Sequence, residues 1–188
     1  MSSILMNIGW TLIAIKVCLL LILFVFTKDT VKSLFVAKPI NDKHVQFEHS
    51  LFMYVFASVV FQLVGRFISD EILAAELGVQ AKRQIFYIFF CIYEGLFMVA
   101  VIQWHNYKRC EFARITTYGF YICAMTVVLN LCRYVDRVVF DTDILRGVYG
   151  QVVALTNIFL CVLMAYYPFY RLTLLFTKKS SGNNKVHD

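Results

Sequence analysis

The sequence has little charge, few prolines and few glycines. Only 16% of its 188 residues are charged and 60% are hydrophobic, whereas a soluble domain is about half apolar and a quarter charged. The mean hydropathy is accordingly high, at +0.69. Two prolines and eight glycines leave little room for long linkers or for an all-β soluble fold. The composition therefore predicts a single integral membrane domain.

Sequence motifs that mark catalytic and metal sites are also missing. The chain contains no HExxH, no GxSxG, no phosphate-cradling glycine loop and no aspartate-rich cation motif, so we expect it not to be an enzyme. Five of its six cysteines lie in apolar runs and CxxC is absent, which argues against metal binding and against a disulfide framework. His49 and His105 flank the ends of expected helices, a poor position for a bis-histidine haem. We predict no metal and no cofactor.

Long apolar stretches run through the chain instead. At ~1.5 Å per residue each is long enough to cross a hydrocarbon core of ~30 Å. The sequence predicts an all-α polytopic membrane bundle with five transmembrane helices, over residues 4–26, 49–69, 84–104, 115–135 and 148–170. The second and fourth stretches both end in an amide, an arginine and an aromatic residue, which suggests the alternative of a lone helix followed by two similar hairpins.

Polar segments separate these stretches and follow the last one. We expect residues 70–83 to form a short interfacial helix, because acidic residues suit its first turn and Gly78 suits its end. Pro168 is expected to bend or end the last helix. Residues 1–176 then form one transmembrane domain, and the polar residues 177–188 form a disordered cytoplasmic tail.

The distribution of Lys and Arg predicts the orientation in the membrane. Most of the 18 basic residues fall in the first loop, the third loop and the tail, and few fall on the opposite side. Basic residues favour the cytoplasm, so we expect the N-terminus outside and the C-terminus inside. The chain has no N-x-S/T sequon, which favours a bacterial origin. The expected location is a bacterial inner (plasma) membrane.

Two opposite charges lie within the expected spans. Glu94 sits in the middle of the third span, where an ionisable group costs roughly 2.5–3.5 kcal/mol, and Lys16 lies at a matching depth in the first. We predict an ion pair that locks two helices together; the alternative is a proton or ion pathway. Gln62, Asn130 and Asn157 would extend this polar layer.

Arg66 and Arg133 lie roughly one turn from the predicted outer interface. Such side chains commonly extend their charged ends toward lipid phosphates. The alternative is an outer vestibule that selects anions or holds an external ligand.

These features lead to a functional hypothesis. We expect a non-enzymatic, self-associating membrane subunit, a sensor, effector or scaffold of the kind used in bacterial antiviral defence or immunity. It would dock a cytoplasmic protein partner through basic residues, namely Lys28, Lys32, Lys38, Lys43, Lys108 and Arg109. The membrane location already explains the basic loops, so no nucleic acid is expected as a direct partner. The alternatives are a small oligomeric ion or proton channel or transporter that uses Glu94 and Lys16, and a membrane-bound enzyme or redox subunit.

Overall fold

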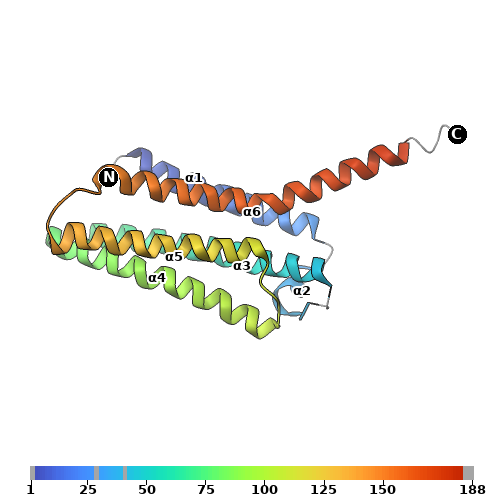
Figure 1. Cartoon of the computed structure of the whole chain (residues 1–188), viewed down its shortest axis with the longest axis horizontal. Coiled ribbons are helices and arrows are strands. Elements are labelled where there is room, and N and C mark those ends of the chain that lie inside the picture. Colours follow the sequence, from blue (N-terminus) through green and yellow to red (C-terminus); the bar gives the residue numbers. More distant parts are fainter. Residues whose placement is uncertain (1–2, 28–29, 40–41, 184–188) are drawn as a thin grey trace.

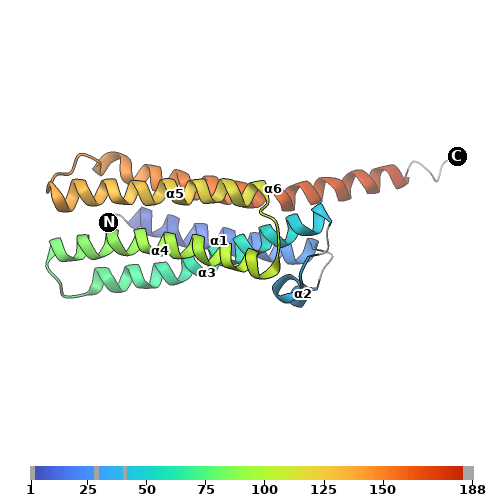
Figure 2. The same ribbon diagram turned by 60° about the horizontal axis from the view of Figure 1, so that its bottom comes forward.

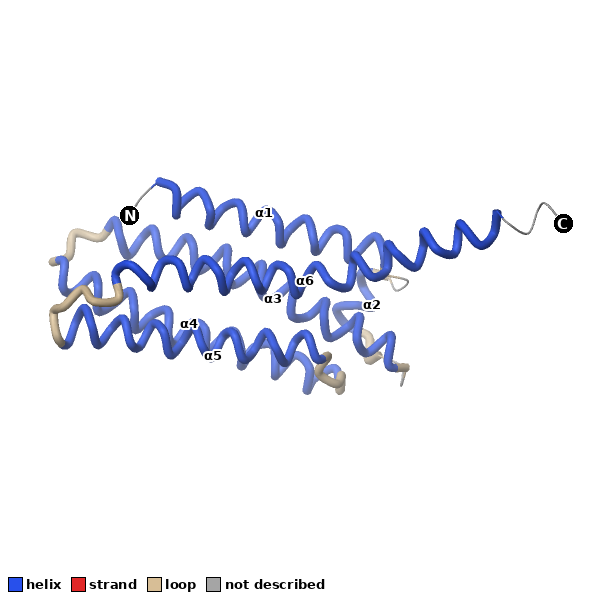
Figure 3. The backbone as a smooth tube through the Cα atoms, turned by 45° about the horizontal axis from the view of Figure 1, so that its top comes forward, coloured by secondary structure: helices blue, strands red, loops and turns tan. Residues whose placement is uncertain are grey.

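The computed structural model describes residues 3–27, 30–39 and 42–183, and within these ranges every regular element is helical (Figure 1). Short loops join the helices (Figure 3). The elements are α1 (Ser3–Phe26), α2 (Val31–Val36), α3 (Lys43–Ala74), α4 (Val79–Lys108), α5 (Arg114–Tyr134), a π-helical turn η1 (Val135–Val139) and α6 (Arg146–Asn183).

Five of these helices are long and apolar enough to cross a membrane. The qualifying segments are Gly9–Phe26, Lys43–Ala74, Val79–Lys108, Arg114–Val139 and Arg146–Tyr166. The all-α prediction and the five membrane-length helices are thereby confirmed. Length and apolar composition together indicate an integral membrane protein.

The five long helices lie side by side and alternate in direction (Figures 1 and 2). α1 packs against α3 and α6, and α4 packs against α3 and α5. The start of α1 and the α3–α4 and α5–α6 connections lie at one end of the bundle, which we call the N-terminal end (Figure 1). The short helix α2 and the α4–α5 connection lie at the other, the α2 end (Figure 1).

An aromatic core fixes α2 to the rest of the bundle. Leu34 of α2 is fully buried, and the Phe35 ring lies 4.9 Å from the Phe52 ring and 5.9 Å from the Trp104 ring, measured between centroids. Thr30 caps the start of α2 by accepting a hydrogen bond from the Ser33 amide at 3.4 Å. The first loop is therefore folded back onto α3 and α4 at this end.

The connection between α3 and α4 differs from the prediction. α3 continues to Ala74 and α4 begins at Val79, so residues 70–83 contain no separate interfacial helix. Asp70 pairs with Arg66 one turn earlier at 3.4 Å, because the continuous helix places side chains four residues apart next to each other. Gly78 is the N-cap of α4 and not the end of a helix.

The last helix is also longer than predicted. Pro168 lies inside α6, which continues to Asn183 and so includes residues expected to be disordered from position 177. α6 bends and projects beyond the bundle at the α2 end (Figures 1 and 3). A proline inside a helix removes one backbone hydrogen bond and kinks the helix, yet the helix resumes after it. Residues 184–188 lie outside the described part of the chain.

Candidate functional site

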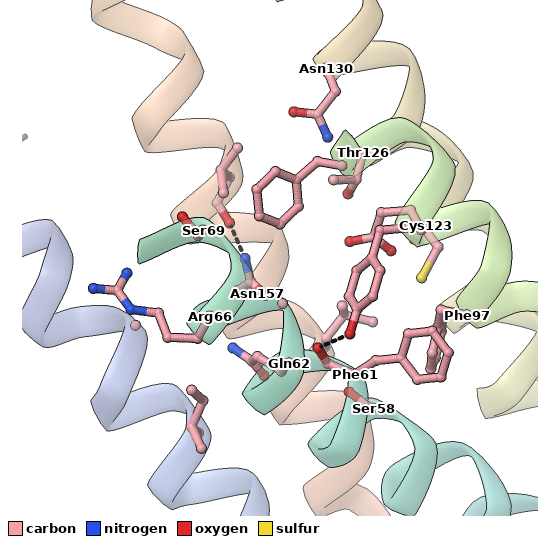
Figure 4. Close-up of a pocket in the computed structure, with 18 of the residues that line it drawn as sticks. Ser58, Phe61, Gln62, Arg66, Ser69, Phe97, Cys123, Thr126, Asn130 and Asn157 are labelled. Carbon is pink, nitrogen blue, oxygen red and sulfur yellow. Dashed lines mark hydrogen bonds between the residues drawn. The ribbon is translucent and has the colours of Figure 1, made fainter. Parts of the chain in front are cut away.

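A cavity of about 270 Å³ lies inside the bundle, between all five membrane-length helices (Figure 4). Its lining includes one of the predicted intramembrane polar residues from each helix: Lys16 of α1, Gln62 of α3, Glu94 of α4, Asn130 of α5 and Asn157 of α6. The structure therefore brings together the whole polar layer that was singled out from the sequence. Apolar side chains and the aromatic rings of Phe61, Phe86 and Phe90 complete the wall.

The two opposite charges in this cavity do not touch each other. Lys16 is 3% exposed and its Nζ donates a hydrogen bond to Ser58 Oγ at 3.0 Å. Glu94 lines the same cavity from α4, and its carboxylate and the Lys16 ammonium attract each other across it. Among the described residues no ion pair joins Lys16 and Glu94 directly, and the hydrogen bond found for the Lys16 ammonium is the one to Ser58. The electrostatic attraction acts at longer range.

Two of the three amides in the cavity join or stabilise helices. Asn130 Oδ1 accepts a hydrogen bond from the Tyr149 hydroxyl at 2.6 Å, which links α5 to α6. Asn157 Nδ2 donates to the Val153 carbonyl of its own helix at 2.9 Å. Gln62 differs, because its Oε1 is buried and has no hydrogen-bond partner within the described ranges. Gln62 is thus an unused acceptor on the cavity wall.

Arg66 lines the same cavity toward the N-terminal end. One face of its guanidinium lies 6.0 Å from the centre of the Trp10 ring, and Nη2 lies 3.4 Å from Asp70 Oδ1. Its Nε is buried without a hydrogen-bond partner in the part of the chain that the structure describes. Figure 4 shows Gln62 and Arg66 on the side of α3 that faces α1.

Arg133 lies elsewhere, although the sequence grouped it with Arg66. Its guanidinium is buried, pairs with Asp136, and holds Asp143 Oδ1 at 2.6 Å through Nη2. Asp136 also accepts hydrogen bonds from the Thr142 hydroxyl and from two backbone amides of the α5–α6 connection. The Arg133 hydrogen bond holds the pKa of Asp143 below its usual range. Arg133 therefore holds the α5–α6 connection in place through Asp136 and Asp143, and it is not among the residues that line the cavity.

The basic residues proposed for docking divide into two groups. Lys32, Lys38, Lys43 and Arg109 are exposed at the α2 end, and Lys28 lies outside the described residues. Lys108 is fully buried: its Nζ donates to the Leu34 carbonyl and lies 2.7 Å from His49 Nδ1. In this conformation Lys108 cannot reach a partner, because its ammonium holds α2 against α3 and α4.

A second buried polar cluster lies near the α2 end. Ser50 Oγ lies 2.9 Å from His105 Nε2 and accepts a hydrogen bond from the Ala113 amide. His105 Nδ1 donates to the Val101 carbonyl, so Nε2 is the acceptor for the Ser50 hydroxyl. Ser50 and His105 are at most 1% exposed, which closes this pair to any substrate. Its contacts join α3, α4 and α5.

The described residues contain no group of three or more His, Cys, Asp or Glu side chains placed to hold a metal ion. Burial raises the pKa of the Cys110 thiol to about 11, so this cysteine stays protonated at neutral pH. The cavity itself presents charged, amide and hydroxyl groups and the thiol of Cys123.

Sequence reasoning missed the hydroxyl-bearing residues of the cavity, among them Ser58 and Tyr149. Ser58, Gln62 and Arg66 follow one another at intervals of four residues along α3, and this helical spacing places them on one face. That periodicity was the available signal for Ser58. Comparisons with protein-family models, with curated proteins and with solved structures find no match to this chain.

Proposed function

We propose that this chain is a small membrane channel or transporter in which an ion or proton occupies the central cavity, with Glu94 and Lys16 at its polar centre. One observation carries the proposal: each of the five membrane-length helices contributes a polar residue to a single cavity. Ionisable residues inside membrane helices are expensive, and they characteristically face a water-filled cavity or an ion pathway.

The packing around these charges favours a pathway over a purely structural pair. A structural pair is expected to be in direct contact and fully hydrogen-bonded. Lys16 and Glu94 instead border an open volume of about 270 Å³, and buried polar atoms of Gln62 and Arg66 in the same wall have no partner among the described residues. Unpaired polar atoms around a cavity suit a site that a solute or water occupies.

The position of the cavity favours a pathway that is closed at one end. Its lining residues extend from the N-terminal end to about the middle of the bundle, from Gly9 to Lys16 in α1, from Phe86 to Phe97 in α4 and from Tyr149 to Leu160 in α6. Toward the α2 end the interior is filled by the Phe52 and Trp104 rings and by the buried Lys108. Passage through the bundle would therefore need a rearrangement at the α2 end, as in a transporter that opens to one side at a time.

The test is ion flux in proteoliposomes that contain the purified protein. Proton, potassium and chloride movements are followed with ion-sensitive dyes under an imposed potential. We expect at least one flux to exceed that of protein-free vesicles, and to fall by at least about tenfold in Glu94→Gln. Glu71→Gln, the same substitution at an exposed position outside the cavity, should leave the flux unchanged. No flux above background, or equal flux in both variants, would overturn the proposal.

The exposed basic residues support a second candidate, the docking of a cytoplasmic partner. Lys32, Lys38, Lys43 and Arg109 remain accessible at the α2 end. The test is the mass of the native particle after gentle-detergent purification, compared between the unmodified chain and a variant with Ser at these three lysines. A partner present in stoichiometric amount that is lost from the variant supports docking, whereas a pure homo-oligomer in both contradicts it.

A further inference from the structure

The cavity holds one unused donor and one unused acceptor on neighbouring turns of α3. Arg66 Nε and Gln62 Oε1 are both buried, and neither has a hydrogen-bond partner among the described residues. The two residues are four positions apart and project from the same side of the helix (Figure 4). A ligand that satisfies both atoms must present an acceptor to Arg66 and a donor to Gln62 within one small molecule.

The charge at this position selects an anion for the first contact. The Nε and Nη groups of a guanidinium form a fork that matches the two oxygens of a carboxylate. The present counter-ion of Arg66 is Asp70, whose side chain is 48% exposed and lies 3.4 Å away. Asp70 is the exposed partner, whereas the Arg66 side chain is only 14% exposed, and their contact leaves Nε unused, so a second anion can bind beside it.

The second contact and the wall define the rest of the ligand. Gln62 Oε1 is an acceptor only, so the ligand must carry a hydroxyl or an amino group close to its anionic end. Phe86 and Phe90 line the same cavity and offer apolar contact to a short carbon chain. The volume of about 270 Å³ lies just below the ~300–1,000 Å³ of drug-sized ligand sites, and so the ligand is small.

We propose that Arg66 and Gln62 form a binding subsite for a small organic carboxylate with a hydroxyl or amino group beside it, an α-hydroxy or α-amino acid. This inference rests on the proposed function, because it names a solute for the same cavity. Arg66 binds the carboxylate, Gln62 accepts a hydrogen bond from the neighbouring hydroxyl or ammonium group, and Lys16 and Glu94 remain as the deeper pair.

Trp10 provides a direct reporter for this subsite. Its ring lies 6.0 Å from the Arg66 guanidinium, and the other tryptophan of the chain, Trp104, lies in the aromatic core at the α2 end. In Trp104→Phe the remaining tryptophan fluorescence comes from Trp10, and it reports on binding at Arg66. Isothermal titration calorimetry of the unmodified chain measures the same binding without that substitution. The probes are glycolate and glycine, with acetate as the analogue without a donor and glycolamide as the analogue without a carboxylate.

We expect a saturable response to glycolate or glycine, with binding at least about tenfold weaker for acetate and for glycolamide. Arg66→Gln should abolish the response, and Gln62→Met should remove the preference for glycolate over acetate. Asp70→Asn should strengthen binding several-fold, because it removes the anion that competes for the guanidinium. Arg109→Gln, an exposed arginine at the other end, is the matched control and should bind as the unmodified chain does.

Several results would overturn the inference. These are no saturable binding in either assay, an equal response to glycolamide, weaker binding in Asp70→Asn, or tighter binding of inorganic phosphate than of any carboxylate. Nanodiscs of neutral and of anionic lipid separate a free ligand from a lipid headgroup: competition by anionic lipid would assign Arg66 to lipid phosphate instead. Ion flux without carboxylate binding would contradict the subsite and leave the proposed channel or transporter standing. Carboxylate binding without ion flux would contradict the channel or transporter and leave the subsite.

Discussion

Lys108 Nζ lies 2.7 Å from His49 Nδ1 and donates a hydrogen bond to the Leu34 carbonyl. These two contacts join the end of α4 to α3 and to α2. A buried ammonium is stable only where several acceptors replace its hydration, and the Leu34 carbonyl and the His49 ring supply two of them. The position of α2 at this end of the bundle therefore depends on a charged side chain as well as on the Phe35 aromatic contacts.

Replacing Lys108 by Met should loosen α2. The Leu34 carbonyl would be left buried without this donor, at a cost of about 1–3 kcal/mol. We expect a lower melting temperature, and faster tryptic cleavage after Lys32 and Lys38, which flank or lie in α2. Arg109→Met, which changes an exposed neighbour, should alter neither measurement. Unchanged cleavage in Lys108→Met would show that the aromatic contacts alone hold α2.

The polar residues of the cavity could be found from the sequence because each interrupts an apolar run. Lys16 and Glu94 contrast sharply with their neighbours, as do Gln62, Asn130 and Asn157, and five packed helices place them at similar depths. Ser58 and Tyr149 were missed since hydroxyl groups are common in membrane helices and cause little contrast. Hydropathy therefore predicts a charged or amide layer better than the hydroxyl groups that complete it.

The sequence could not predict the direction in which a basic side chain turns at the end of a helix. Lys108 and Arg109 are neighbours in one basic loop, yet Lys108 is buried and Arg109 is exposed. Arg66 and Arg133 occupy similar sequence patterns, but Arg133 is enclosed by Asp136 and Asp143, while Arg66 lines the cavity. These differences arise from contacts between segments far apart in the chain.

Gly119 is predicted to be indispensable for the packing of α5 against α3. A Cβ atom at this position would overlap the Tyr54 hydroxyl and ring, and Tyr54 is only 1% exposed and therefore tightly held. Gly119→Ala should lower the stability by about 1–3 kcal/mol, the usual cost of overpacking. Thermal unfolding in detergent measures the effect.

Gly95→Ala is the matched control for that substitution. Apart from its chain neighbours and the backbone of its own helix, no heavy atom lies within 4 Å of the position that a Cβ would take at Gly95, in the middle of α4. Alanine is favoured over glycine inside a helix by roughly 0.5–1 kcal/mol, so this variant should unfold at a higher temperature. Gly119→Ala is thus expected to lower the melting temperature and Gly95→Ala to raise it. A loss of stability at both positions would mean that helix packing is tighter around Gly95 than the structure has it.

Asp143 should make the stability of the α5–α6 connection dependent on pH. The hydrogen bond from Arg133 Nη2 at 2.6 Å lowers the pKa of Asp143 in the folded state, whereas an unfolded Asp titrates near ~3.9. A carboxyl group with a lowered pKa contributes stability that is fully present above ~3.9 and is lost as the pH falls through its folded-state value. Asp143→Asn should therefore lower the melting temperature near neutral pH.

The difference between Asp143→Asn and the unmodified chain should shrink as the pH falls from ~3.9 through the lower pKa of folded Asp143. The unfolded carboxylate gains its proton first, which favours unfolding, and the native carboxylate becomes neutral only at still lower pH. Asp141→Asn is the control: its side chain is 79% exposed and its contact with Arg83 is 3.5 Å, so its removal should have little effect at any pH. Melting temperatures of the three proteins, measured in detergent from neutral pH down to roughly pH 3, give the comparison. A difference that stays constant over this range would mean that Asp143 acts through its shape and hydrogen bonds alone, and that its charge contributes nothing to holding the connection.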